Sequence, residues 1–510
     1  MNRITHGTAD LAPAYDVVVI GLGVTGTGVA LDAVSRGLSV LAVDAHDLAF
    51  GTSRWSSKLV HGGLRYLASG QVGIAHESAV ERGILMENTA PHLTRAMPML
   101  LPLTSSVSVG QALLARGGLV AGDLLRRGAR TDRETLPRPR RISATETLAL
   151  APGLRSAGLR GGLLSWDGQL EDDARLVTTI ARTAADLGAD IRTRSRVVHA
   201  TGTGVTLRDE LTGDAAEVAA RAVVNAAGVW AGDLADEVTL RPSRGTHLVL
   251  RADRLPGLRT SVTAPVPGST SRFVLVLPQP DGTVYVGLTD EPLDGPIPDV
   301  PTPTEPEIGF LLDVVSAAFA HDLRRTDVIG AYAGLRPLLE AGAGQTADLS
   351  RKHAVLTGRS GLITVVGGKL TTYRQMAEDA VDRAVAASRL DADRCRTRTL
   401  PLTGAAPRPA LARLEDHPRL VRRFGTDAAV VLSEARDVTG LSADELLAPI
   451  APHLPATLAE LVFGVTHEGA VDVEDLLDRR TRIGLVAADR ALAVSAAERA
   501  LALVAAAQGR

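Results

Sequence analysis

Residues 15–26 read Tyr15-Asp-Val-Val-Val-Ile-Gly-Leu-Gly-Val-Thr-Gly26, a short apolar run that ends in a glycine pattern. The run predicts a buried strand, the residues that follow to position 36 predict a helix, and residues 38–43 predict a second strand. These three segments make a βαβ unit. Backbone N–H groups between its first strand and its helix would suit a pyrophosphate.

The glycine pattern is supported by an acidic residue further along the chain. Asp44 ends the second strand, 23 positions after Gly21, where a carboxylate would bind a ribose hydroxyl. A glycine-rich turn in an ordinary α/β protein is the alternative. We favour dinucleotide binding because the strand, the helix and Asp44 occur in the required order.

The composition limits the class of protein. At ~150 residues per domain, the 510 residues suggest two to four domains. The 55 basic and 58 acidic side chains leave a net charge of −3, and 45% of the residues are apolar. Disorder is therefore disfavoured, and with aromatic residues at only 3% we expect no nucleic acid partner.

Cysteine usage and the N-terminus predict the compartment. The single cysteine, Cys395, excludes an intrachain disulfide and a cysteine-built metal site, and we expect no metal. The first residues lack the layout of a signal peptide, and no stretch approaches the ~20 uncharged apolar residues of a membrane span. We therefore expect a cytoplasmic protein that meets a membrane only at its surface.

The rest of the chain alternates between strand and helix patterns as far as about residue 400. Helices are predicted at 172–188 and 369–388, and strands at 191–200, 204–208, 222–225, 246–251, 272–277 and 283–289. A proline-rich loop is predicted at 292–306. The remainder is rich in Ala, Leu, Arg and Glu, and its helical period predicts a separate helical domain.

Three further glycine-containing segments lie at 51–66, 225–230 and 365–374, and each alone is also typical of a structural turn. Together they carry a resemblance. Ser56-Ser-Lys-Leu-Val-His-Gly-Gly-Leu-Arg-Tyr66 and Gly367-Gly-Lys-Leu-Thr-Thr-Tyr-Arg374 resemble the signatures of FAD-dependent sn-glycerol-3-phosphate dehydrogenases. That family belongs to the wider group of flavin amine and hydroxy-acid oxidases.

The likeness covers nearly the whole chain in order. It continues through residues 172–176, 245–247, 289–290, 334–337 and 474–481. Two positions depart from the family pattern, Asp44 where glutamate is usual and Arg54 where serine is usual. We therefore expect a shorter ribose contact and altered contacts in the loop that contains Arg54.

The resemblance implies an α/β fold with three parts: a doubly wound Rossmann-like FAD-binding domain, an interleaved antiparallel β substrate domain and a C-terminal α-helical domain. The oxidoreductase region would span 1–395 and the helical domain 396–510. The expected FAD-binding parts are about 14–90, 150–240 and 325–395, and the expected substrate-domain parts are about 91–149 and 241–324.

The resemblance also implies FAD as the cofactor. Fifteen residues match positions that bind it: Gly21, Gly23, Gly26, Asp44, Thr52, Ser53, Ser57, Lys58, Gly62, Gly63, Ala227, Gly228, Gly368, Lys369 and Leu370. We favour non-covalent attachment, although His61 in the flavin loop leaves a covalent bond open.

Six residues match the family's substrate site, three at the substrate phosphate and three at its hydroxyl end. The first set is Arg65, Tyr66 and Arg351, and the second is His247, Arg336 and Lys369. Arginine forks suit a dianionic phosphomonoester because they donate paired charge-assisted hydrogen bonds. Outside these motifs His247 would be typical of a structural histidine, and Arg351 of a solvated basic loop.

The implied reaction oxidises glycerol 3-phosphate to dihydroxyacetone phosphate and passes the electrons from FAD to a membrane quinone. Loss of a hydride from carbon and a proton from oxygen requires a base and nearby cations. His247 is our first candidate for the base because its reference pKa lies near neutral, and Lys369 or Arg336 would stabilise negative charge on the oxygen. Lys369 stays the alternative base because neighbouring cations could lower its pKa.

Three other functions stay open. A glycerol-3-phosphate oxidase of the same fold would pass electrons to oxygen and release hydrogen peroxide. A non-catalytic FAD-binding partner protein would not need the cations of the substrate site, and an amino-acid oxidase would need fewer of them. The oligomeric state is open between a monomer and a homodimer.

One segment is strongly basic. Residues 126–141 hold seven arginines against Asp132 and Glu134, and they follow an apolar segment at 109–125. Together the two segments would form an amphipathic surface element on anionic lipid, or the arginines would form a solvated loop. The first reading places the protein peripherally on the inner face of the cytoplasmic membrane, with the membrane surface as a partner.

Overall fold

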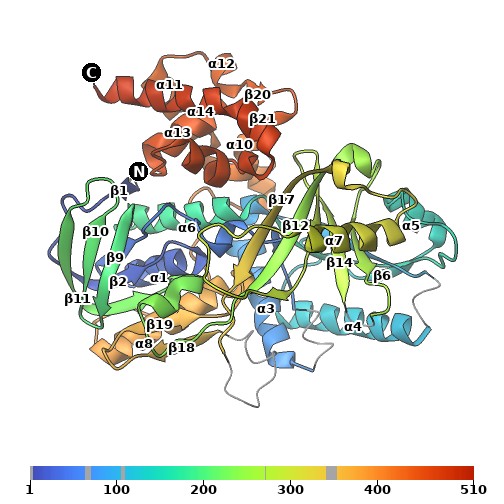
Figure 1. Cartoon of the computed structure of the whole chain (residues 1–510), viewed down its shortest axis with the longest axis horizontal. Helices are drawn as coiled ribbons and strands as arrows, with labels where there is room; N and C mark the ends of the chain where they lie inside the picture. The colour runs from blue at the N-terminus through green and yellow to red at the C-terminus, as the bar shows by residue number, and fades with distance from the viewer. Residues whose placement is uncertain (1–3, 64–69, 105–108, 270–271, 341–352, 510) are drawn as a thin grey trace.

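The computed structural model describes residues 4–63, 70–104, 109–269, 272–340 and 353–509. It has two large sheets, the first on the left of Figure 1 and the second on the right, and the C-terminal helices lie above them. This arrangement confirms the expected α/β fold class.

The first sheet is mostly parallel. Its order is β1 (Thr5–His6), β8 (Asp190–Thr193), β3 (Val40–Val43), β2 (Ala14–Ile20), β11 (Ala215–Asn225), β10 (Gly204–Asp209) and β9 (Ser195–Thr201). Strand β10 pairs antiparallel with β11, and β9 pairs antiparallel with β10, so the three strands form a meander at this edge. Strand β19 (Ile363–Val366) pairs in parallel with the end of β11, and β18 (Ala354–Thr357) pairs with β19.

Both faces of the first sheet are buried, which explains the continuous apolar run in β2. Val17 and Val19 pack into the core that includes the helices, whereas Val18 and Ile20 pack into a separate core on the opposite face. The helices that contribute to the first core are α1 (Val24–Ser35), α6 (Asp173–Asp186) and α8 (Tyr373–Ser388). A strand buried on both faces is apolar at every position rather than at alternate ones.

The second sheet is mainly antiparallel. Its order is β16 (Glu291–Pro292), β12 (Ser243–Arg251), β15 (Thr283–Gly287), β14 (Phe273–Pro278), β13 (Ser261–Pro265), β5 (Thr94–Pro102), β7 (Gly162–Leu170) and β4 (Leu59–Val60). Strand β17 (Val328–Arg336) also pairs with β12, and β6 (Arg140–Ile142) pairs with β7. Three helices flank this half of the molecule in Figure 1: α4 (Val109–Gly128), α5 (Ala144–Leu150) and α7 (Glu305–Ala318).

Three strands from the parts expected to bind FAD pair in the second sheet. They are β4, β7 and β17, from the expected parts 14–90, 150–240 and 325–395. The reason is that β7 pairs along its whole length with β5, and β17 pairs with β12. Local sequence patterns predict strands, but the partner of each antiparallel strand is set by tertiary packing.

The C-terminal domain is helical with one small hairpin. Its elements are α9 (Arg408–Leu411), α10 (Pro418–Phe424), α11 (Ala428–Thr439), α12 (Ala443–Leu447), β20 (Pro449–Ala451), β21 (Leu454–Thr457), α13 (Leu458–His467), the π-helix η10 (Asp475–Arg480), the 3-10 turn η11 (Ile483–Leu485) and α14 (Ala487–Gln508). The helical composition did not predict the β20–β21 hairpin, because each of its strands has only three or four residues.

Helix α14 is long and apolar enough to cross a membrane, and within the described ranges it is the one helix that meets this test. We expected no such segment. A core helix meets the same test, and four residues on one side of α14 pack into the C-terminal core: Ala493, Ala497, Ala500 and Val504. The helix is therefore weak evidence for a membrane span.

Candidate cofactor and substrate site

Three turns that we expected to bind the cofactor lie at one edge of the first sheet. The register pairs Asn225 of β11 with Ile20 of β2 and with Thr364 of β19, so these strands end side by side. The turns that follow β11 and β19 contain Ala227, Gly228, Gly368, Lys369 and Leu370. Ligands of open α/β sheets bind outside the carboxyl ends of the strands, and this edge is such a position.

The glycine turn after β2 has no room for side chains. Gly21 has a φ of +99°, and a Cβ there would lie 2.7 Å from the carbonyl oxygen of Ala226. A Cβ on Gly26 would lie 1.8 Å from the carbonyl oxygen of Gly21. Gly23 is the N-cap of α1 and has no side chain with which to cap the helix. The positive end of α1 therefore fits a pyrophosphate.

Asp44 follows β3 at the same edge. Its Oδ2 accepts a hydrogen bond from the amide of Leu22 at 2.7 Å, and its Oδ1 accepts one from the amide of His46 at 2.8 Å. Burial raises the pKa of this carboxyl. These bonds hold Asp44 against the glycine turn, where its remaining lone pairs fit a ribose hydroxyl.

The segment after Asp44 is anchored at two of the expected cofactor positions. Thr52 Oγ1 donates to the carbonyl oxygen of Leu335 at 2.6 Å, and Ser53 Oγ accepts from the amide of Val24 at 2.9 Å. The first bond ties the segment to β17 and the second ties it to the start of α1.

Lys58 anchors the same segment from inside the protein. Its side chain is buried, and Nζ pairs with the Asp173 carboxylate at 2.8 Å and donates to the carbonyl oxygen of Arg54 at 2.6 Å. The ammonium is therefore satisfied inside the protein and holds the segment to α6. The cofactor contact expected of Lys58 stays a prediction, and sequence alone could not reveal the buried partner of its ammonium.

The two glycines after β4 lie beside an acidic anchor. The amide of Gly62 donates to Asp167 at 3.1 Å, and a Cβ on Gly62 would lie 2.1 Å from Arg82 Nη1. Gly63 has a φ of +78°, which favours glycine. Asp167 also lies 3.0 Å from Nδ1 of His61, so this histidine is oriented by a carboxylate.

His247 lies on β12 and is fully buried. Its Nε2 lies 2.8 Å from Ser57 Oγ, and its ring stacks on Tyr332 with centroids 4.8 Å apart. Burial, together with the charges of Lys58 and Arg336, lowers the pKa of His247 to about 3. Nδ1 has no hydrogen-bond partner among the described residues, so one ring nitrogen is left for a ligand.

Arg336 reaches the same region from the neighbouring strand. The register pairs it with Ser243, while His247 pairs with Tyr332. Its guanidinium contacts Asp290 at 2.9 Å, Ser243 Oγ at 3.1 Å and the carbonyl oxygen of Thr289 at 3.1 Å. These contacts fix a cation near His247.

Lys369 reaches the site from the first sheet. It precedes the short turn η8 (Leu370–Thr372), and its Nζ donates to Ser78 Oγ on α3 (Val72–Ile84) at 2.8 Å. The structure thus brings His247 and Arg336 together, and it places the Lys369 ammonium beside α3. Three further predicted residues lie outside the described ranges: Arg65, Tyr66 and Arg351.

Sequence analysis missed the residues that hold the His247 strand. Glu307, near the start of α7, accepts hydrogen bonds from Thr246 Oγ1 at 3.0 Å and Thr289 Oγ1 at 2.8 Å. A capping box of Thr304 and Glu307 was visible in the sequence and predicts the start of α7. It gave no sign that the same carboxylate would also bind β12.

Comparison with known proteins agrees with this geometry. Residues 16–374 match the family model described as FAD dependent oxidoreductase, and 395–509 match the C-terminal domain of alpha-glycerophosphate oxidase. Glycerol-3-phosphate dehydrogenase 1 of Mycobacterium tuberculosis is 54% identical over 484 residues, 94% of this chain and 93% of that one. The chain belongs to the family of FAD-dependent glycerol-3-phosphate dehydrogenases.

More distant relatives agree. Aerobic glycerol-3-phosphate dehydrogenase of Staphylococcus aureus is 34% identical over 92% of this chain and 86% of its own. The structure of glycerol-3-phosphate dehydrogenase from Bacillus halodurans in complex with FAD has a TM-score of 0.72 and 28% identity, and the match covers 96% of this chain and 90% of that one. L-alpha-glycerophosphate oxidase from Mycoplasma pneumoniae shares the fold, with a TM-score of 0.56 over 77% of this chain and 99% of that one.

The cofactor of this family member is FAD, and the residues at the sheet edge fit it. The turn that Gly21 and Gly26 keep free of side chains fits the pyrophosphate, and Asp44 fits a ribose. Among the described residues no group of three or more His, Cys, Asp or Glu side chains could hold a metal ion.

Proposed function

We propose that the protein oxidises sn-glycerol 3-phosphate to dihydroxyacetone phosphate and passes the electrons to a membrane quinone. Bound FAD supplies the hydride acceptor. The observation that carries the proposal is a buried neutral histidine beside a fixed arginine, in a family whose members are named for this substrate. An alcohol that loses a hydride needs both a proton acceptor and a cation near its oxygen.

His247 is the proposed base. Because its pKa is about 3, the ring is neutral at the pH of the cytoplasm and can accept a proton. If Nε2–H donates to Ser57 Oγ, the lone pair on Nδ1 is available to the substrate hydroxyl. Arg336 would stabilise charge on the substrate oxygen, and Lys369 stays the alternative base.

The phosphate would be bound by Arg65, Tyr66 and Arg351. This part of the proposal rests on the family motifs alone. A dianionic phosphate calls for bidentate arginines, and two of the three residues supply them. The motif places Arg65 two positions after Gly63, the last described residue before it.

Membrane attachment is proposed to be peripheral and electrostatic, on the inner face of the cytoplasmic membrane. Helix α4 exposes Val120 and Leu124 by 57% and 59%, and the basic segment begins in its last turn. Arg126 does not contribute to the exposed charge of that segment. It is buried, pairs with Asp123 at 2.8 Å and donates to the carbonyl oxygen of Thr131. The charge that lipid would attract belongs to its exposed arginines: Arg127, Arg130, Arg133, Arg138, Arg140 and Arg141.

One experiment tests the substrate and the acceptor together. Purified protein is reduced anaerobically with glycerol 3-phosphate, and reoxidation is then followed with oxygen and with a soluble quinone analogue. We expect bleaching of the flavin and faster reoxidation by the quinone. Faster reoxidation by oxygen, with release of hydrogen peroxide, would make the protein an oxidase. No bleaching would favour a non-catalytic FAD-binding protein.

A further inference from the structure

We propose that the C-terminal domain is a positioning element of the FAD site, and that it acts through Arg479 and Arg480 on Asp47. The target is residues 44–58, here called the cofactor segment, which carries Asp44 at one end and Ser57 near the other. The proposal depends on FAD as the cofactor but not on the identity of the substrate.

Asp47 is bound almost wholly by the C-terminal domain. Its carboxylate is 0% exposed and accepts a hydrogen bond from Arg479 Nε at 2.6 Å. It accepts two more from Arg480, at 2.8 Å to Nη1 and at 2.8 Å to Nη2. Both arginines lie on η10, more than 430 residues away along the chain. A carboxylate that faces two guanidinium groups in a buried site has a sharply defined position.

The rest of the cofactor segment is built around this contact. Asp47 is three positions from Asp44, and Phe50 stacks on His46 with ring centroids 3.8 Å apart. The guanidinium of Arg479 also lies 5.8 Å from the Phe50 ring. The C-terminal domain therefore contacts the middle of the segment, between Asp44 and the turn that begins at Thr52.

Helix η10 is itself held in place by other contacts, so it can fix the position of Asp47. Arg480 Nη2 donates to the carbonyl oxygen of Glu468 at 2.6 Å, and Arg479 pairs with Asp475. The Glu468 carboxylate forms two bonds of 2.6 Å with Arg175 of α6, both side chains being at most 1% exposed. The domain is thus tied to the helix that begins at Asp173, the partner of Lys58 in the cofactor segment.

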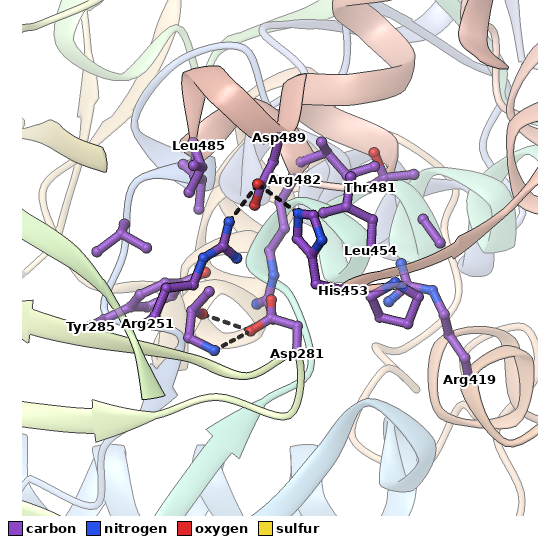
Figure 2. Close-up of a pocket in the computed structure, with 16 residues that line it drawn as sticks. Arg251, Asp281, Tyr285, Arg419, His453, Leu454, Thr481, Arg482, Leu485 and Asp489 are labelled. Atoms are coloured by element: carbon purple, nitrogen blue, oxygen red, sulfur yellow. Dashed lines mark hydrogen bonds and ion pairs between the residues drawn. The ribbon is translucent and has the colours of Figure 1, made fainter. Parts of the chain in front are cut away.

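A second set of contacts ties the domain to the other sheet. Figure 2 shows Arg251 and His453 meeting at Asp489, with Arg482 beside Asp281. Arg482 Nη2 lies 2.9 Å from the Asp281 carboxylate, and Nη1 donates to the carbonyl oxygen of Glu171 at 2.8 Å. The domain is therefore held by α6 and by the second sheet as well as by its contact with the cofactor segment.

The test measures FAD binding in the full chain. Apoprotein is titrated with FAD, and binding is followed by quenching of flavin fluorescence. Asp47→Asn and Arg480→Gln should each raise the Kd for FAD at least about tenfold, which corresponds to ~1.4 kcal/mol. The visible circular dichroism of bound FAD should change in both variants, since the cofactor segment is displaced.

Arg419→Gln is the matched control. Arg419 is a buried arginine of the same domain, but its partner at 2.6 Å is Glu460, also of that domain. The control should melt at a lower temperature and yet bind FAD with the parent Kd. An unchanged Kd in Asp47→Asn would overturn the proposal, as would an equal loss of FAD affinity in the control.

Two further variants cover the case in which Arg480→Gln fails to fold. Arg480→Lys keeps the charge with one donor group and should lose less affinity than Arg480→Gln. In a double-mutant cycle, Asp47→Asn with Arg479→Gln should raise the Kd by less than the product of the single effects, because both remove one contact. Full additivity would show that Arg479 acts elsewhere.

Discussion

The protonation state of His247 can be tested by the pH dependence of flavin reduction. Burial and two neighbouring cations lower its pKa from 6.5 to about 3. A shift of that size disfavours the charged ring by about 5 kcal/mol. The proposed base is therefore neutral throughout the range in which the protein can be assayed, and the rate should not fall near the reference pKa of histidine.

We expect the rate of flavin reduction, measured by anaerobic stopped flow with saturating glycerol 3-phosphate, to be nearly constant from about pH 8 to about pH 5. His247→Ala should lower this rate at every pH and change substrate binding less, because the base acts in the transition state. A wild-type rate that falls with a midpoint near the reference pKa of 6.5 would refute the reasoning.

Arg336→Gln sharpens the test, because it removes one of the charges that lower the pKa of His247. The rate of flavin reduction should fall. The pH below which this rate declines, the acid limb of the profile, should be higher than in the parent. Arg241→Gln is the control, since its side chain is 78% exposed and lies outside the site. The same movement of the acid limb in this control would show that net charge, rather than local geometry, sets the profile.

Three other predictions test the cofactor turn, the domain contacts and the membrane surface. Gly26→Ala should yield colourless protein, measured by flavin absorbance, because its Cβ would lie 1.8 Å from the oxygen of Gly21. Glu468→Gln should lower the free energy of unfolding by ~3–5 kcal/mol in urea melts, since it leaves the buried Arg175 without its partner. One triple variant should release the protein from anionic vesicles in co-sedimentation and keep activity with a soluble acceptor: Arg127→Gln, Arg130→Gln and Arg133→Gln.

The lowered pKa of Glu468 determines how the stability of the protein depends on pH. Against the effect of burial, Arg175 lowers the pKa of Glu468 from 4.5 to about 2. The folded-state pKa lies below the unfolded value, so the stabilisation is complete above 4.5 and is lost as the pH falls toward 2. The difference in stability between Glu468→Gln and the parent should therefore shrink across that window.

The first βαβ unit could be predicted because its signals are local. The apolar run of β2 and the glycine pattern set the strand, the turn and the helix within a few residues. Outside this unit, the strand expected at 191–200 is divided into β8 and β9 at Arg194, which has a φ of +57°. The sequence does not predict a positive φ at this position, because an arginine seldom adopts one.

The properties that decide the chemistry could not be predicted, because they depend on distant partners. The motif identified His247, but its low pKa depends on burial and on Lys58, a residue expected to bind the cofactor. The partner of the Lys58 ammonium could not be predicted for the same reason, since Asp173 lies on another element. Residue type gives the chemistry that is available, and tertiary packing decides which group uses it.

Several buried ion pairs lie where the C-terminal domain contacts the rest of the chain. Ion pairs such as Arg175–Glu468 and Arg480–Asp47 are poor sources of stability, because desolvation offsets much of their attraction. Their geometry is strict, however, and a domain docked in any other register would leave several of these charges buried without partners. Apolar packing would tolerate small shifts of the domain, whereas this surface does not. Such a contact suits a domain that must place Asp47, and with it the cofactor segment, in one position.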